Sequence, residues 1–398
     1  MTRQLITDRW LLPEGVEGLL PQQAEYLEQL RRQLLDLFHS YGYELVMPPL
    51  IEYLDSLLVG TGHDLDLQTF KIIDQYTGRL MGLRADMTPQ VARIDAHQLR
   101  RETPSRLCYM GTVLHARAEQ GSSRTPLQVG AELYGHRGAE SDVEILSLML
   151  EMMAEVGLQG GSVDLGHVGI FRGLSEQAGL SSEQEQLLFD ALQRKSKPEI
   201  HEYLANGEID ADVAEMILAL ADLNGDYDTL ERAATVLAKA SEAVHQAIAN
   251  IAEIAKQVQQ RHPEAVLHFD LAELRGFNYH TGVVFAAYLP GCAQAIAQGG
   301  RYDDIGQAFG NARPATGFSA DLKQMVAQLN SNLHNISAIL APHGDSVGLR
   351  DAIKSLRSQG ERVIETLPGQ AVSANEMACD RILVNDNGSW IVTEAENS

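Results

Sequence analysis

The feature that most constrains the fold of this chain is a long helical segment that separates two segments with the patterning of β-strands. Over about residues 175–262, apolar residues such as Val244 and Ile248 recur at helical spacing. Short apolar runs separated by turn residues lie on both sides, over residues 65–135 and again from Ala265. Because the sheet patterning resumes, we interpret the helical segment as an insertion into one domain and predict an α+β fold.

An amphipathic helix and a short strand precede this region. Apolar residues spaced three and four apart predict one buried helical stripe, formed by Leu27, Leu30, Leu34, Leu37, Phe38 and Tyr41. Gly42 is expected to end the helix. The next residues, 43–47, are predicted to form a strand that stops at Pro48-Pro49, because proline cannot donate to a sheet ladder.

The remaining elements predict one main domain and a small lobe. Expected strands include residues 70–73, 78–83, 106–109, 113–114, 125–135 and 265–270, with a helix over 141–156 and a capping box at 182–185. A strand at 338–340, a helix at 349–356 and a strand at 381–384 predict a compact α/β unit. We therefore expect a domain over residues 1–330, which contains the insertion, and a C-terminal lobe over 331–398.

Charge restricts the partners of the chain. Its 31 Lys and Arg residues against 54 Asp and Glu residues give a net charge of −23, which disfavours binding to a phosphate backbone. Three distant cysteines provide neither a disulfide framework nor a zinc cluster. No signal peptide or membrane span is evident, so we expect a cytoplasmic protein without contact with a membrane.

Several polar residues are candidates for a binding site. Gln128, Gly130 and Glu132 fall on one face of a predicted strand, which is typical of a pocket for an amino group and equally of an exposed sheet face. Residues 84–89 place a charge pair and a hydroxyl at a strand end, where a solvated turn with a helix cap is the alternative. Tyr279 is either a pocket wall or a core tyrosine.

Other motifs exclude some chemistry. His280 has no second ligand at a spacing typical of metal sites, so no metal site is expected. Residues 298–303, Gln-Gly-Gly-Arg-Tyr-Asp, match neither a Walker loop nor a dinucleotide-binding fingerprint, and alone they indicate a tight turn.

In their order along the chain, these pieces resemble class II aminoacyl-tRNA synthetases. The helix followed by residues 42–49 is similar to motif 1, residues 111–135 to motif 2, and residues 299–303 with Gly317-Phe318 to the approach to motif 3. Residues 84–88 resemble the amino-acid loop of histidyl-tRNA synthetase, and residues 274–285 its histidine-specific motif. Over about residues 10–330, the resemblance implies an antiparallel sheet flanked by helices, and dimerisation partly through motif 1.

The sequence departs from the active synthetases at the nucleotide contacts. His115 stands where the family has the motif 2 arginine that contacts the ATP α-phosphate, and Arg117 stands in place of a glutamate that orients adenine. Gln324 replaces the motif 3 arginine, and it is neutral. Arg124 matches a motif 2 loop arginine, which leaves a residual anion site open.

The amino-acid side of the pocket matches the family better. The resemblance implies a histidine-binding site formed by Asp86, Thr88, Gln128, Glu132, Arg275 and Tyr279. In that site Glu132 and Asp86 would hold the ammonium group, Arg275 the carboxylate, and Tyr279 the imidazole. His280 replaces a second tyrosine that the family places beside the imidazole.

Several segments of the chain resemble the sequences of ATP phosphoribosyltransferase regulatory subunits more than those of active synthetases. They are residues 68–74, 84–90 with 93–97, 123–128 and 164–168. That resemblance implies a protein without a cofactor that is not itself an enzyme but acts with a glycosyltransferase. It also implies a short-form catalytic subunit as partner in a hetero-octamer, free histidine as effector, and a role in the first step of histidine biosynthesis. Binding of tRNA is not expected, since residues 331–398 carry five Lys or Arg against nine Asp or Glu.

Two other functions remain open at this point. One is a divergent histidyl-tRNA synthetase or another ligase that forms aminoacyl-adenylates, as the retained pocket and Arg124 suggest. The other is a synthetase-like domain that senses uncharged tRNA, against which the net charge argues.

Overall fold

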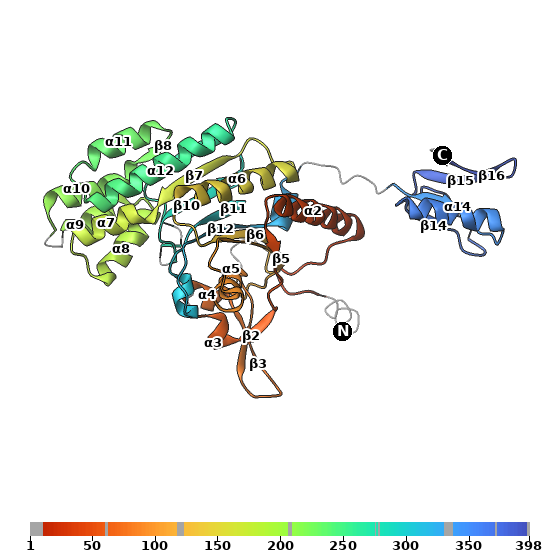
Figure 1. Cartoon of the computed structure of the whole chain (residues 1–398), viewed down its shortest axis with the longest axis horizontal. Coiled ribbons are helices and arrows are strands. Elements are labelled where there is room, and N and C mark those ends of the chain that lie inside the picture. The colour runs from red at the N-terminus through yellow and green to blue at the C-terminus, as the bar shows by residue number, and fades with distance from the viewer. Residues whose placement is uncertain are drawn as a thin grey trace, which may run out of the picture. The chain divides into compact units, whose positions relative to one another are not determined.

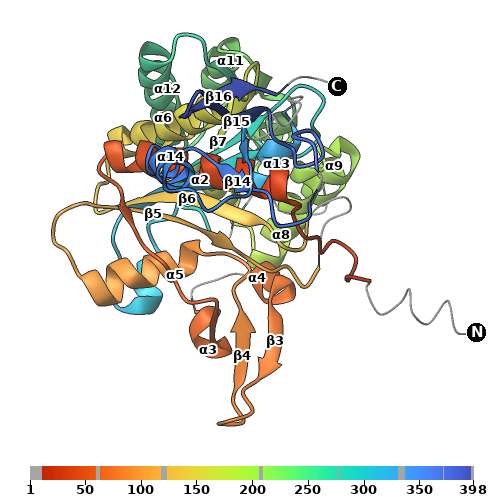
Figure 2. The same cartoon turned by 90° about the vertical axis from the view of Figure 1, so that its right-hand side faces the viewer.

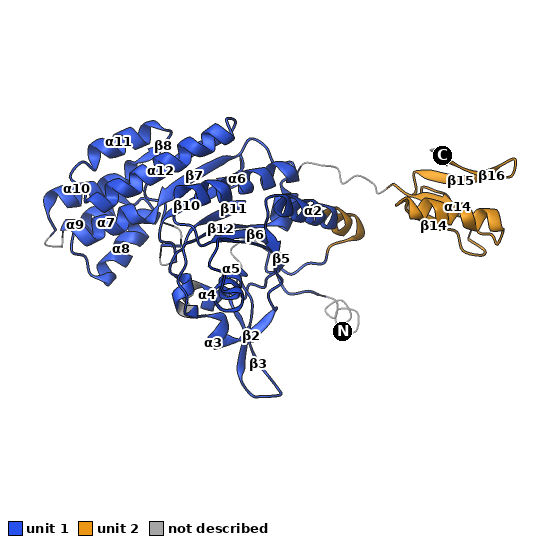
Figure 3. Ribbon diagram, in the orientation of Figure 1, with its two compact units in different colours: residues 1–18, 27–329 blue, residues 19–26, 330–398 orange. Residues whose placement is uncertain are grey.

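The computed structural model describes residues 11–59, 63–117, 123–205, 209–274, 276–277, 279–329, 337–370 and 372–395. Two compact units make up the chain (Figure 3). The first comprises residues 1–18 and 27–329, and the second comprises residues 19–26 and 330–398.

A nine-stranded sheet forms the centre of the first unit, in the order β1-β5-β6-β12-β11-β10-β7-β9-β8. The pairs β1–β5 and β7–β9 are parallel and the other pairs are antiparallel. The strands are β1 (Glu44–Leu45), β5 (Ser105–Thr112), β6 (Leu127–Tyr134), β7 (Ser162–His167), β8 (Asn224–Gly225), β9 (Val266–Asp270), β10 (Val283–Tyr288), β11 (Ala297–Arg301) and β12 (Ala315–Asp321). The predicted α+β organisation is therefore confirmed, with β1 shorter than the expected strand and no strand at residues 113–114.

Helices flank this sheet (Figure 1). They are α2 (Pro21–Ser40), α5 (Thr88–Arg93), the π-helix η2 (Ile94–Leu99), α6 (Ala139–Val156), the 3-10 helix η4 (Ile305–Phe309) and α13 (Leu322–Ala327). Two short helices, α3 (Leu54–Leu57) and α4 (His63–Gln68), lie in the chain between two strands of a second sheet. Helix α6 packs against β12 and β6, and α5 packs against β6. The central strand β6 is therefore shielded from solvent, and seven of its eight residues, from Gln128 to Tyr134, are buried.

Helix α2 follows the predicted stripe. Leu27, Leu30, Leu34 and Phe38 are its buried residues. The Phe38 ring meets the ring of Phe318 on β12 edge-on, with 6.2 Å between the centroids, which fixes the helix against the sheet. Gly42 has a φ of +81°, the left-handed conformation that ends a helix at little cost for glycine.

The first unit also contains a second, three-stranded sheet, with the strand order β2-β4-β3. It consists of β2 (Ile51–Tyr53), β3 (Phe70–Ile73) and β4 (Leu80–Leu83), all antiparallel. Strands β3 and β4 form a hairpin that extends away from the nine-stranded sheet in both views (Figures 1 and 2).

The helical segment lies between β7 and β9 in the chain. Its helices are α7 (Val168–Gln177), α8 (Ser182–Gln193), α9 (Lys197–Ala205), α10 (Ala211–Ala219), the 3-10 helix η3 (Leu220–Asp222), α11 (Asp228–Val236) and α12 (Glu242–Arg261). The capping box starts one residue before the predicted position, because the Ser181 hydroxyl accepts from the Gln184 backbone N–H and the Gln184 side chain accepts from that of Ser181. The long helix α12 packs against α6 and α7, which joins the helices to the sheet domain.

The C-terminal part of the second unit is a small α/β fold. Its sheet has the order β14-β13-β15-β16, with β13 (Ile339–Ala341), β14 (Val363–Glu365), β15 (Arg381–Asp386) and β16 (Ser389–Glu394). Helix α14 (Val347–Ser358) packs on one face through Leu349 and Ile353. A second cluster that includes Cys379 and Leu340 gives this lobe a core of its own.

Candidate functional site

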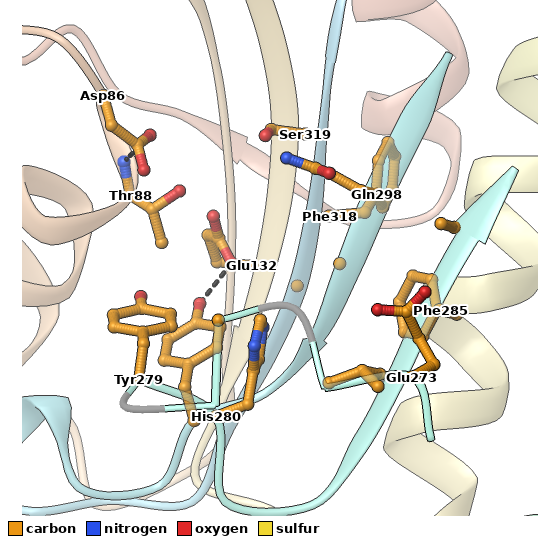
Figure 4. Close-up of a pocket in the computed structure, with 16 residues that line it drawn as sticks. Asp86, Thr88, Glu132, Glu273, Tyr279, His280, Phe285, Gln298, Phe318 and Ser319 are labelled. Atoms are coloured by element: carbon orange, nitrogen blue, oxygen red, sulfur yellow. Dashed lines mark hydrogen bonds between the residues drawn. The ribbon is translucent and has the colours of Figure 1, made fainter. Parts of the chain in front are cut away.

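A cavity of about 190 Å³ opens in the first unit, beside the strands β6, β10, β11 and β12. Asp86 and Thr88 lie at one end of it together with Glu132, whereas Glu273 and Phe285 lie at the other end (Figure 4). Four of the six residues predicted to bind a ligand, Asp86, Thr88, Glu132 and Tyr279, therefore line one cavity.

Glu132 is the innermost polar group of this cavity. It lies on β6 opposite Leu107 of β5 and Gly317 of β12, and only 1% of its surface is exposed. A methyl group at Gly317 would overlap the Glu132 carboxyl group, so the missing side chain at this position makes room for it. The register of three strands thus places one carboxyl group at the floor of the pocket.

Two tyrosines hold the Glu132 side chain. The Tyr109 hydroxyl donates to Oε1 at 2.8 Å, and the Tyr302 hydroxyl donates to Oε2. The pKa of Glu132 is raised to about 8, mainly by burial; the nearby Asp86 carboxylate also raises this pKa, whereas hydrogen bonds with Tyr302, Tyr109 and Thr88 lower it. The Glu132 carboxyl group is therefore largely protonated at neutral pH, and a cation bound beside it would favour its ionised form.

Asp86 is held in place by its neighbours. Its Oδ1 accepts the Thr88 backbone N–H at 3.0 Å and the Gln128 amide Nε2 at 2.7 Å. The other amide atom of Gln128, Oε1, accepts the Met87 backbone N–H at 2.9 Å. Gln128 is not among the residues that line the cavity. In this structure it orients Asp86 through the hydrogen bond of its amide group to the Asp86 carboxylate.

Aromatic side chains form another wall. The Tyr279 ring stacks on that of Tyr302 with 5.0 Å between the centroids and meets the His280 ring edge-on at 5.3 Å. The buried Tyr279 hydroxyl has no hydrogen-bond partner among the described residues, and a ligand that reached it would satisfy it. Arg275, expected to bind a carboxylate, lies outside the described residues.

The charges of the pocket favour a cationic ligand. Its lining contains the acidic residues Asp86, Glu132 and Glu273, and no Lys or Arg is among the described lining residues. Within the described part of the chain, no three His, Cys, Asp or Glu residues are placed to hold a metal ion. The pocket thus has the polar groups of a site for an amino compound and not those of a phosphate site.

The positions that the resemblance matches to ATP contacts of active synthetases make local contacts in this structure. The His115 Nε2 lies 3.1 Å from the Ala85 carbonyl oxygen. The Arg124 guanidinium donates to the carbonyl oxygens of His115 at 3.0 Å and Ala116 at 3.2 Å. The same group also lies over the Phe70 ring. Since backbone acceptors already engage it, Arg124 has a structural role that does not require an anion.

Three residues that matter for the pocket were not predicted as site residues. Tyr302 and Tyr109 orient Glu132, and Gly317 provides space for it. Tyr302 belongs to the Gly-Gly-Arg-Tyr-Asp motif, which by itself indicated only a turn. Its contact with Glu132 spans 170 positions in the sequence, and no local pattern reports such a pairing.

Comparisons with known proteins show which families the chain resembles. Residues 15–325 match the histidyl-tRNA synthetase family, and residues 336–393 match the C-terminal domain of ATP phosphoribosyltransferase subunit HisZ. The chain is 57% identical to an ATP phosphoribosyltransferase regulatory subunit of Thioalkalivibrio sulfidiphilus over 98% of this chain and 99% of that protein. It is also 57% identical to one of Alkalilimnicola ehrlichii, over 97% of each chain.

Solved structures show the same fold. A Bacillus halodurans protein described as an ATP phosphoribosyltransferase regulatory subunit/histidyl-tRNA synthetase superposes with a TM-score of 0.81 at 27% identity, covering 93% of this chain and 96% of that one. Histidyl-tRNA synthetase of Nostoc has a TM-score of 0.77 at 18% identity, over 97% of each chain. The predicted class II synthetase-like architecture is therefore confirmed.

Proposed function

Because the chain belongs to the family of ATP phosphoribosyltransferase regulatory subunits, we propose that it activates a short-form catalytic subunit and makes that subunit sensitive to inhibition by histidine. The observation that carries this proposal is that the amino-acid pocket is retained while the residues expected at the nucleotide contacts are replaced. The amino-acid pocket around Glu132 is formed and acidic, whereas the nucleotide positions carry His115 and Gln324 in place of arginines. A protein with such a site senses an amino acid and does not adenylate it.

Free histidine is the proposed ligand of the pocket. Glu132 and Asp86 hold its ammonium group, Thr88 adds a polar contact, and Tyr279 lines the space for the imidazole. Gln128 supports this arrangement through its hydrogen bond to Asp86. Arg275 receives the carboxylate, as the resemblance to histidyl-tRNA synthetase implies.

Regulation requires that histidine bind the inhibited assembly more tightly than the active one, since a ligand shifts an equilibrium only by its difference in affinity. The proposed assembly is a hetero-octamer with the catalytic subunit in the cytoplasm, in which this chain pairs with a second copy partly through α2 and β1. No tRNA takes part, because the charge of −23 opposes binding to nucleic acid. In the described part of the chain, no helix is both long and apolar enough to span a membrane.

Reconstitution tests the proposal. The purified chain is added to a purified short-form catalytic subunit, and phosphoribosyl transfer is measured with and without histidine. We expect a higher turnover that histidine then suppresses. Unchanged turnover together with unchanged inhibition would refute the proposal.

An adenylate-forming ligase is the alternative from the enzyme class, and the formed amino-acid pocket is the observation in its favour. Histidine-dependent exchange of pyrophosphate into ATP separates the two functions. We expect no exchange by the pure chain, because His115 and Gln324 cannot provide the charge that two arginines give the phosphates. Measurable exchange would favour the ligase.

A further inference from the structure

The distal half of the β3–β4 hairpin (residues 70–83) exposes large apolar side chains. Ile73 and Leu80 lie directly opposite each other in the ladder, and they are 68% and 46% exposed. Tyr76, in the turn between the strands, is 97% exposed. An apolar cross-strand pair beside an exposed tyrosine is typical of the anchor residues of protein interfaces.

Local contacts fix the turn of the hairpin. The Asp74 carboxylate accepts the Tyr76 backbone N–H at 3.0 Å and the Thr77 hydroxyl. Gly78 adopts a φ of +73°, and the Asp74 backbone N–H donates to the Arg79 carbonyl oxygen at 2.9 Å. A partner would therefore pay little of the entropic cost of ordering this surface.

The charge of the hairpin differs from that of the whole chain. Residues 70–83 contain two cations, Lys71 and Arg79, and one anion, Asp74, while the chain has a net charge of −23. The Lys71 ammonium also pairs with the Asp66 carboxylate at 2.8 Å, so the charges of this region balance. The Arg79 guanidinium lies 3.4 Å from the centre of the Tyr53 ring, which places a positive charge at the edge of the apolar surface. An acidic partner can approach this hairpin with less repulsion than most of the surface would exert.

The hairpin is also connected directly to residues 84–88, which include the pocket residues Asp86 and Thr88. Strand β4 ends at Leu83, and the next residue, Arg84, is held by four hydrogen bonds, one of which its carbonyl oxygen accepts from the Leu114 backbone N–H at 3.0 Å. Its backbone N–H donates to the Leu50 carbonyl oxygen at 3.0 Å, and its side chain donates to the carbonyl oxygens of Pro48 at 2.6 Å and Thr112 at 2.9 Å. Asp86, which lines the pocket, follows two residues later. A ligand that displaces Asp86 would therefore act on the hairpin through a short and rigid stretch of backbone.

We propose that the ATP phosphoribosyltransferase catalytic subunit docks on the β3–β4 hairpin, and that the catalytic subunit receives the hairpin in an apolar cleft rimmed by carboxylates. The histidine pocket of this chain is coupled to this contact through β4. The proposal rests on the proposed function. The β1 edge and α2 remain available for pairing with a second copy of the chain, so each of the two contacts has its own surface.

Binding between purified full-length chains tests the proposal. The variants are Ile73→Asp and Tyr76→Ala, and the matched control is Leu187→Asp, since Leu187 is a 40% exposed leucine on α8 in the helical segment. Calorimetry gives the affinity for the catalytic subunit, sedimentation gives the self-association of each variant alone, and thermal unfolding shows that it is folded. Histidine binding by each isolated variant is measured in parallel.

Each hairpin variant is expected to weaken binding of the catalytic subunit by about tenfold or more. The control, the self-association and the histidine affinity of the isolated chain are expected to stay at wild-type values. Equal affinity of wild type and hairpin variants for the catalytic subunit would overturn the proposal, and so would loss of self-association in these variants, which would assign the hairpin to a second copy. If the wild-type chain itself failed to bind the catalytic subunit, the proposed function would fall, and this proposal with it.

Discussion

Replacing Glu132 by glutamine is predicted to remove a specific pH dependence from the stability of the chain. The carboxyl group has an ordinary pKa of 4.5 when exposed, and burial raises the pKa to about 8 in the folded state. The folded chain therefore holds a proton between these values that the unfolded chain has released, and stability falls as pH rises through this range. The loss begins near the unfolded pKa and is complete above the folded pKa.

The magnitude follows from linkage. One proton held by the folded state alone costs about 1.4 kcal/mol per pH unit. With a folded pKa of about 8 for Glu132, the free energy of unfolding should fall by about 2 kcal/mol between about pH 6 and pH 8. Glutamine does not titrate, and its amide can still hydrogen-bond to Tyr109 and Tyr302.

Urea denaturation over this pH range, without ligand, measures the effect. The matched control is Glu253→Gln, which makes the same chemical change at an exposed position of α12. The difference in the free energy of unfolding between wild type and Glu132→Gln should change by about 2 kcal/mol across the range, while the control follows the wild type. If the Glu132→Gln variant kept the slope of the wild type, the account of a buried, protonated carboxyl group would be refuted.

Two further predictions concern the space beside Glu132 and a buried ion pair. Gly317→Ala should abolish histidine binding, because the added methyl group overlaps the Glu132 carboxyl group, whereas Gly18→Ala, where nothing lies within 4 Å of the new atom, should bind normally in the same titration. Arg313→Ala should lower the free energy of unfolding by about 3–5 kcal/mol, since it leaves the 2% exposed Asp95 side chain without its cation. A loss below about 1 kcal/mol in urea denaturation would contradict that prediction.

The sequence predicted the elements of the fold where a local period carried the information. The stripe of α2 and the strand β3 appear at the predicted positions, and in α2 the apolar spacing alone determines which face is buried. Strand β1 is shorter than predicted, since only Glu44 and Leu45 pair with β5. Such a limit depends on the neighbouring strand and leaves no mark in the local sequence.

The candidate site divides in the same way. The period of two on β6 placed Gln128 and Glu132 on one face, but it does not distinguish the residue that lines the cavity from the one that supports Asp86. That difference arises from the register with β12, where Gly317 lies opposite Glu132 and Asp321 lies opposite Gln128. Pairings between distant strands depend on the whole fold, and so the support of the pocket could be found only in the structure.

The most direct test of the central claim is histidine inhibition of the reconstituted complex, measured with the wild-type chain and with Glu132→Gln. Histidine should suppress phosphoribosyl transfer by the wild-type complex. Relative to its own uninhibited rate, the complex with Glu132→Gln should need at least about tenfold more histidine, because a charge-assisted contact to the ammonium group is lost. Equal inhibition of the two complexes would contradict the claim that this pocket is the histidine sensor.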